Sequence, residues 1–196
     1  MKTIIASIIS IAALLLTSSA YALLVTPLPK IEIPKGEKAV TLHINDDDHT
    51  WQAYVYRVEQ SGDGKETLIE SEDIIVYPTV FKAPRSLKLV LNRPIDRSTE
   101  SYYRIIVRQI DVDKGTGIKA LLELSIPVFV KAEKENISKR IICGDNITIK
   151  NSGNTHLKFI VNKKAPLYVM QGKTITIQKV SLKDEEGKEY CGGQKL

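Results

Sequence analysis

Apolar side chains occupy every even position from Ile118 to Val128. A two-residue period is typical of a β-strand, in which alternate side chains point to the same face of a sheet. Such a strand presents one continuous apolar face. Most faces of this kind pack against the core of their own domain. The alternative is that part of the face is offered to another protein, and the strand pattern alone leaves both interpretations open.

Other segments also have the pattern of strands separated by turns. Lys38–Ile44 alternates and ends at the polar run Asn45–Asp48, which has the composition of a turn. Trp51–Val58 is aromatic and β-branched and is followed by a turn with two glycines, Ser61–Gly64. No amphipathic helical period is sustained. Strands at a spacing of roughly 8–12 residues, with turn clusters between them, predict an all-β sandwich.

The first 22 residues have the pattern of a signal peptide. Lys2 supplies the positive start, Ile4–Leu16 is almost wholly apolar, and Ala20–Ala22 forms an A-x-A cleavage site. The apolar stretch is short for a transmembrane helix. We therefore expect cleavage near Ala22, a mature chain beginning near Leu23, export out of the cytoplasm, and no stable membrane insertion.

Two cysteines, Cys143 and Cys191, are present in this exported chain. Compartments outside the cytoplasm permit disulfides, so an even pair predicts a bond between them. In the chain-entropy model, closing a loop of this length contributes about 4 kcal/mol before any strain is subtracted. Both cysteines lie in the C-terminal part of the chain, where a small domain buries little surface and gains most from a cross-link.

A short charged segment, Lys131–Glu135, divides the mature chain. It has no bulky apolar residue and is a plausible linker. We therefore predict an N-terminal domain at residues 23–130, a linker at 131–135, and a short C-terminal β domain at 136–196. The N-terminal part has the size of one immunoglobulin-like sandwich.

The sequence offers no converging set of catalytic residues. It has no G-x-S-x-G, H-E-x-x-H or glycine-rich phosphate loop, so we expect neither enzyme activity nor a cofactor. His43, His49 and His156 are dispersed and no C-x-x-C occurs, so no metal site is predicted. The 28 basic and 23 acidic residues are scattered, which disfavours nucleic acid as a partner. A partner that bears a carboxylate remains compatible with the net charge.

Several blocks resemble the periplasmic chaperones of the chaperone–usher pilus systems, the PapD-like family. The resemblance covers the whole N-terminal domain, and its order and spacing are more specific than any single block. The pattern of Tyr-Arg with Ile-Pro-Val is closer to the alternative or archaic branches of the family. The blocks are Val25–Lys30, Gly36–Asn45, Val76–Pro84, Glu100–Arg108, Ile126–Val130 and, in the second domain, Ile147–Phe159, which includes Asn151–His156.

The resemblance implies a boomerang of two immunoglobulin-like β-sandwich domains, the second one short. It also implies a function: capping pilin subunits in the periplasm and delivering them to an outer-membrane usher. In this family the last strand of the first domain fills the gap in an incomplete subunit sandwich, which is donor-strand complementation, a form of β-augmentation. Carried over to this chain, the donor positions are Ile118, Ala120, Leu122 and Leu124.

The resemblance also implies an anchor for the subunit's C-terminal carboxylate. Its first basic residue falls on Lys30, but the second falls on Pro127, which has no charge and no backbone donor. Arg104 and Arg108 share the outward face of the preceding predicted strand and could supply the missing charge. The alternative is that these arginines belong to an ordinary solvated face. A further family feature, an X-Pro bond that is commonly cis, falls at Pro78.

Two other functions remain compatible with the sequence. A structural or adhesive pilus subunit would carry an N-terminal donor extension and lack a last strand, whereas here a final strand leads into the linker. A periplasmic binding module could also use an immunoglobulin scaffold, because a fold alone does not determine function. The second domain is also markedly shorter than the resemblance implies, which leaves open how that domain is completed.

Overall fold

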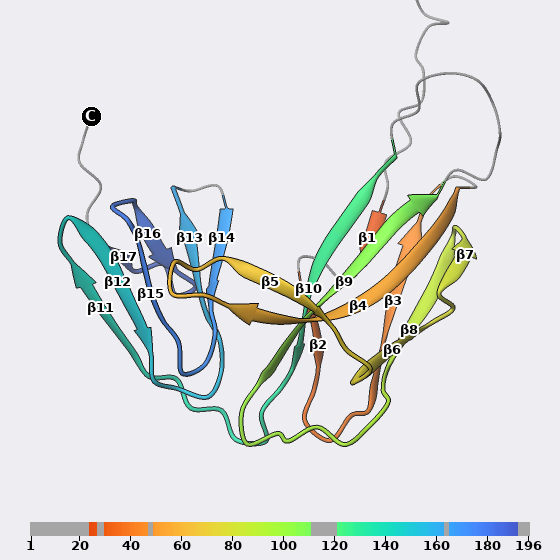
Figure 1. The fold of residues 1–196 in the computed structure, drawn as a ribbon, viewed down its shortest axis with the longest axis horizontal. Helices are drawn as coiled ribbons and strands as arrows, with labels where there is room; N and C mark the ends of the chain where they lie inside the picture. Colours follow the sequence, from red (N-terminus) through yellow and green to blue (C-terminus); the bar gives the residue numbers. More distant parts are fainter. Residues whose placement is uncertain (1–23, 27–29, 47–48, 111–120, 163–164, 192–196) are drawn as a thin grey trace, which may run out of the picture.

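The computed structural model describes residues 24–26, 30–46, 49–110, 121–162 and 165–191, and the regular elements among them are β-strands. The strands form two lobes that meet at the base of a V (Figure 1). The first lobe contains β1–β10 and the second contains β11–β17. The predicted fold class, two immunoglobulin-like sandwiches in a boomerang, is confirmed. The predicted signal peptide, residues 1–22, lies outside the described residues, and none of the described residues forms a helix long and apolar enough to cross a membrane.

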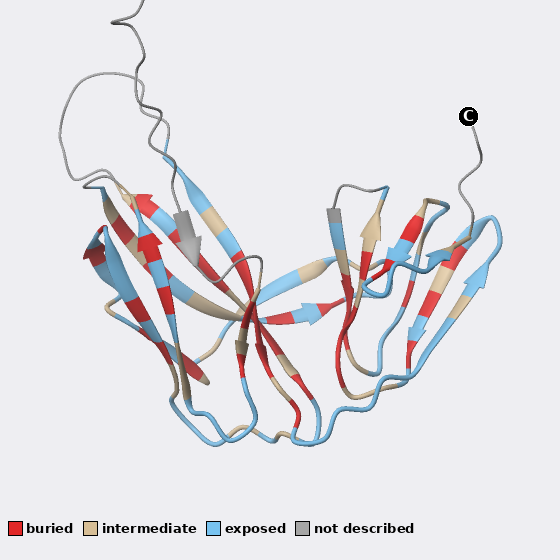
Figure 2. Ribbon diagram, turned by 180° about the vertical axis from the view of Figure 1, so that it is seen from behind, coloured by how far each residue is buried: buried red, intermediate tan, exposed pale blue. Residues whose placement is uncertain are grey.

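Two sheets face each other in the first lobe, with the orders β1-β3-β8-β6 and β2-β10-β9-β4-β5; β7 pairs with β4. Buried and exposed residues alternate along the strands, as Figure 2 shows. The side chains between the sheets include Trp51, Leu42, Leu87 and Ile105, all fully buried. The strands are β1 (Leu24–Thr26), β2 (Ile31–Ile33), β3 (Ala39–Asn45), β4 (Thr50–Gln60), β5 (Glu66–Glu70), β6 (Ile74–Tyr77), β7 (Val80–Lys82), β8 (Arg85–Leu91), β9 (Ser101–Ile110) and β10 (Glu123–Val130).

The second lobe has two smaller sheets, with the orders β11-β12-β15 and β14-β13-β16-β17. Its core contains Ile147, Phe159 and Ile175. The predicted disulfide between Cys143 and Cys191 is present, with the two Cα atoms 5.3 Å apart. The strands are β11 (Lys139–Cys143), β12 (Asn146–Asn151), β13 (Leu157–Val161), β14 (Ala165–Val169), β15 (Thr174–Gln178), β16 (Leu182–Asp184) and β17 (Glu189–Tyr190).

The alternating run that predicted the last strand divides into two parts. Ile126 and Val128 are buried in the core of their own domain, and Leu124 packs against that core. Leu122 precedes β10 and is 51% exposed. The C-terminal part of the run is therefore an ordinary core strand, whereas Leu122 lies beyond the core. Ile118 and Ala120, the other predicted donor positions, lie outside the described residues.

An aromatic stack joins the two lobes. Phe129, at the end of β10, is fully buried; its ring centroid lies 4.9 Å from that of Tyr102 and 3.9 Å from the imidazole of His156. Tyr168 from β14 packs against the same rings, at 5.4 Å from Phe129. Because Phe129 and Tyr102 belong to the first lobe and His156 and Tyr168 to the second, the stack fastens the lobes to each other. At Pro78, where the resemblance implied a cis bond, the Tyr77–Pro78 peptide is cis.

Candidate binding cleft between the lobes

The outer edge of β10 is only partly occupied. On one side β9 pairs with the whole of β10, but on the other β2 pairs in parallel with Val128–Val130 alone. Over Glu123–Pro127, therefore, no strand among the described residues pairs with that outer edge. An unpaired strand edge is a template for pairing with another chain.

The hydrogen bonds of the β9–β10 ladder show which groups point to that edge. The N–H of Gln109 donates to the carbonyl of Leu122 at 2.8 Å, and the two residues lie opposite each other in the register of the ladder. In an antiparallel pair such bonded positions alternate with non-bonded ones. The odd positions of β10, including Ser125 and Pro127, therefore direct their backbone groups away from β9. Pro127 costs that ladder no hydrogen bond and removes one donor from the open edge.

Two basic residues flank Pro127. Arg104 is its cross-strand partner on β9, and continuing the parallel register of β2 by one residue places Lys30 on its other side. The outward face of β9 carries Arg104 and Arg108, as predicted, whereas Tyr103 and Ile105 point into the core. The position where the resemblance expects a second basic residue is thus occupied by proline, but a guanidinium lies beside it.

Arg104 lines a cavity of about 450 Å³ between the lobes. Its Nε donates to the Glu66 carboxylate at 2.5 Å, and Nη1 makes a longer bond to the Ser125 hydroxyl, at 3.3 Å. Burial would lower the pKa of Arg104, but the bond to Glu66 raises it overall, so the side chain stays cationic. The Nη atoms are the ones that can hold a carboxylate end-on with two bonds. The lining residues are Gly64, Glu66, Arg104, Ser125, Pro127, Pro166, Leu167 and Tyr168.

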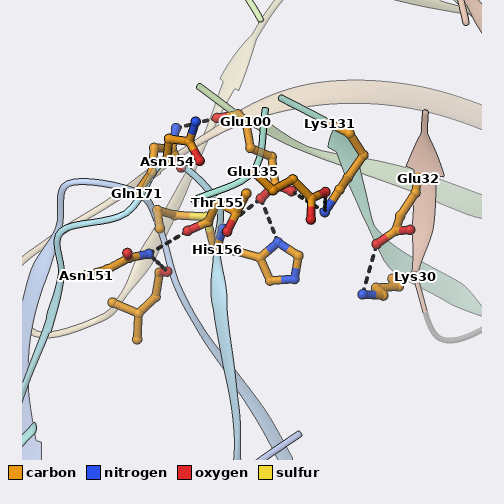
Figure 3. A network of polar contacts seen from close by, with 12 residues as sticks. Lys30, Glu32, Glu100, Lys131, Glu135, Asn151, Asn154, Thr155, His156 and Gln171 are labelled. Carbon is orange, nitrogen blue, oxygen red and sulfur yellow. Dashed lines mark hydrogen bonds and ion pairs between the residues drawn. The ribbon is translucent and has the colours of Figure 1, made fainter. Parts of the chain in front are cut away.

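The other two predicted anchor residues are placed differently. Lys30 forms an ion pair with Glu32 at 2.9 Å (Figure 3). It is not among the residues that line the cavity. Arg108 is bound to Glu123 at 2.6 Å, and its side chain is 58% exposed. It lies four residues along β9 from Arg104, roughly 13 Å away, and it is not among the residues that line the cavity. The structure thus brings Lys30 and Arg104 to one row and leaves Arg108 outside it.

A buried polar network lies behind the cleft, and the sequence analysis did not predict it. Glu100 is fully buried and accepts hydrogen bonds from the N–H of His156, at 2.9 Å, and from its Nδ1, at 2.6 Å. Lys131, the first residue after β10, places its Nζ 3.1 Å from the other Glu100 oxygen (Figure 3). Burial would raise the pKa of Glu100, but His156 and Lys131 together hold it below its usual range. The network therefore places the charged carboxylate of Glu100, from the first lobe, against His156 of the second lobe.

Acid is expected to weaken this junction. Because the pKa of Glu100 is lower in the folded protein than in the unfolded chain, its contribution to stability is complete above the usual glutamate range. That contribution is lost as the pH falls through the lowered folded value. Melting curves between pH 7 and pH 3 should show the loss, and Glu100→Gln should melt lower at pH 7 and depend less on pH. Equal pH slopes for the two proteins would contradict the assignment.

No family model matches the chain, and no curated protein matches it. Solved structures do match over most of its length. The CsuC–CsuE chaperone–tip adhesion subunit complex of archaic Csu pili from Acinetobacter baumannii gives a TM-score of 0.65 at 21% identity, covering 86% of this chain and 96% of that one. The SafA pilin–SafB chaperone complex from Salmonella enterica gives 0.62 at 11% identity, covering 88% and 95%. The E. coli chaperone DraB gives 0.59 at 16% identity, covering 86% and 94%.

These likenesses define the fold. The alignments with these pilus chaperone structures cover 86–88% of this chain and 94–96% of the other chain, so they extend over both lobes. The resemblance found in the sequence is therefore confirmed at the level of the fold, including its likeness to an archaic system. At sequence identities of 21% or less, the comparison supports the fold alone.

Proposed function

We propose that this protein is a non-enzymatic periplasmic chaperone that caps pilin subunits by adding β10 to their incomplete sandwich and then delivers them to an outer-membrane usher. The observation that carries the proposal is the open edge of β10 over Glu123–Pro127, with Leu122 exposed at one end and Arg104 in the cleft at the other. Two of the similar structures are complexes of a chaperone with a pilin or tip subunit, which supports the same role here.

Strand addition needs free backbone groups and apolar side chains at alternate positions. The odd positions of β10 supply the backbone groups. Leu122 continues the apolar face of Leu124 and Ile126 beyond the domain's own core, and Ala120 and Ile118 continue the same alternation in the sequence. A leucine or isoleucine that becomes fully buried in a subunit groove would contribute about 1.5–3 kcal/mol.

The carboxylate end of the subunit would lie at the row of Lys30, Pro127 and Arg104. A charge-assisted bond there fixes the register of the added strand, since the chain end can reach the cations in only one alignment. The lobe that would do this work has its last strand in place between β9 and β2. A structural pilus subunit would instead lack that strand, so the alternative of a subunit is less well supported.

The anchor can be tested with two forms of one peptide, the C-terminal strand of a pilin that co-purifies with this protein, with a free carboxylate or with a C-terminal amide. Wild type should prefer the free carboxylate by about 10-fold to 100-fold, the equivalent of roughly 1.5–3 kcal/mol for a hydrogen bond to a charged group. Arg104→Ala should lose most of this preference and Lys30→Ala part of it. Arg108→Ala is the matched control, because it removes the same side chain from the same strand face outside the cavity.

Loss of the preference in Arg108→Ala alone would show that the anchor lies further along β9. A wild-type protein that binds both peptides equally would remove the carboxylate anchor from the proposal.

A further inference from the structure

The β4–β5 hairpin projects from the first lobe and reaches the second (Figure 1). Its turn lies between Gln60 and Glu66, which are cross-strand partners. The turn is braced from within, because the N–H of Ser61 donates to the carbonyl of Lys65 at 2.9 Å. Hydrogen bonds from the Ser61 hydroxyl and from Lys65 also hold the pKa of Asp63 well below its usual range. The hairpin therefore presents a preformed tip.

This tip bridges the two edge strands on the open side of the second lobe. The carbonyl of Gly62 accepts from the N–H of Thr176 on β15, at 2.8 Å. The Gln60 amide donates to the carbonyl of Tyr168 on β14, at 2.7 Å, and accepts from the N–H of Met170, at 3.0 Å. β14 and β15 are the edges of different sheets, and Gln60 is only 5% exposed. One hairpin thus satisfies backbone groups on both sheets of the other lobe.

The tip also covers apolar side chains of the second core. Gly64 has φ +83°, a conformation that favours glycine, and a Cβ built on it would lie 3.5 Å from Ile175 and 3.9 Å from Leu167. The turn therefore lies directly on residues that belong to or pack against that core. The second domain is short, and the first domain supplies the side wall that it lacks.

The same hairpin holds the guanidinium of the cleft. Glu66 accepts from Arg104 Nε at 2.5 Å and from the Tyr102 hydroxyl at 3.0 Å. Because Gln60 and Glu66 lie opposite each other, one cross-strand pair touches the second domain through Gln60 and Arg104 through Glu66. A single cross-strand pair therefore connects the second domain to the guanidinium of Arg104.

We propose that the second domain is a positioning element for Arg104 and that it acts through the Gln60–Glu66 pair. The proposal rests on the function proposed above, in which Arg104 holds the subunit's carboxylate. In this arrangement Gln60 and Glu66 are positioning residues, because they act on the subunit through the direction of the Arg104 guanidinium.

Gln60→Ala removes both side-chain hydrogen bonds to the second domain. Gln52→Ala is the matched control, since it removes the same kind of side chain from an even position of the same strand, away from the tip. Two quantities are measured in the full-length protein. Hydrogen exchange of the Thr176 and Met170 amides reports docking of the tip, and the ratio of affinities for the free-carboxylate and amidated peptides reports the anchor. In Gln60→Ala we expect both amides to exchange at least about 10-fold faster and the affinity ratio to fall about fivefold or more, with binding of the amidated peptide unchanged. Gln52→Ala should change neither quantity.

Glu66→Gln tests only the contact between Glu66 and Arg104. It replaces Gln60→Ala as the test if that variant does not fold. It leaves the docked tip intact but removes the negative charge that holds Arg104 Nε, so the affinity ratio should fall while exchange of both amides stays at the wild-type rate. Faster exchange with an unchanged ratio in Gln60→Ala, or an unchanged ratio in Glu66→Gln, would overturn the positioning role and leave the anchor in place. A wild-type ratio near one would instead remove the anchor itself, and this inference with it.

Discussion

Leu122→Glu should leave the free protein almost as stable as wild type and abolish recovery of a bound subunit. Leu122 is half exposed and lies beyond the core, so a carboxylate there remains hydrated; we expect a change within about 1 kcal/mol, as for other exposed positions. In a subunit groove the same carboxylate would be buried without a partner, and the leucine contact would be lost as well. Together these effects should weaken binding by about 100-fold or more. A melting curve and a periplasmic pull-down measure the two quantities.

Ile105→Glu is the contrast for this experiment. Ile105 is fully buried on the inward face of β9 and lies opposite Ile126. A glutamate there has no partner in the core, so we expect a loss of more than about 4 kcal/mol and little folded protein. If Leu122→Glu melted as low as Ile105→Glu, the segment before β10 would be part of the core, and the chaperone proposal would lose its main physical support.

Phe129→Ala should have the largest effect at the junction of the lobes. The ring stacks on Tyr102 and His156 and is fully buried, so its removal leaves a cavity that the surrounding rings cannot fill. We expect a loss of about 3–5 kcal/mol in chemical denaturation, together with faster proteolysis after Lys131 and Lys134. Tyr54→Ala serves as the control, because Tyr54 lies on the same sheet face but is 40% exposed, and its loss should cost less than about 1 kcal/mol. Equal effects of the two changes would show that the stack does not hold the lobes together.

Local pattern was sufficient to predict many of the strands, the disulfide and the outward direction of Arg104. Each of these depends on residues close in sequence or on composition: the two-residue period sets the face of a side chain, and an even cysteine pair in an exported chain predicts a bond. The same period could not show that Leu124 packs against its own core while Leu122 does not. That difference depends on where the opposite sheet ends.

The parts of the cleft that the sequence did not predict depend on long-range contacts. Glu66 is 38 residues from Arg104, and Gln60 is 108 residues from Tyr168. In the sequence His156 has no evident partner, because the carboxylate that it contacts, Glu100, lies 56 residues away. No local signal in hydrophobicity or turn composition marks such pairs. The docking of one lobe on the other creates them, and they become visible only once both sandwiches are in place.

Pro127 has a consequence for how the protein behaves at high concentration. A strand edge left open for a partner can equally well pair with a second copy of the same edge, and edge-to-edge association of this kind leads to aggregation. When two identical edges meet, each copy contributes its own proline, so the shared ladder lacks two hydrogen-bond donors. Glu123, at the start of the open segment, and Arg108, opposite it on β9, also place charges beside that ladder. A ladder formed with a partner strand that has no proline lacks only one donor. The proline therefore penalises self-association more heavily than pairing with a partner strand that has no proline.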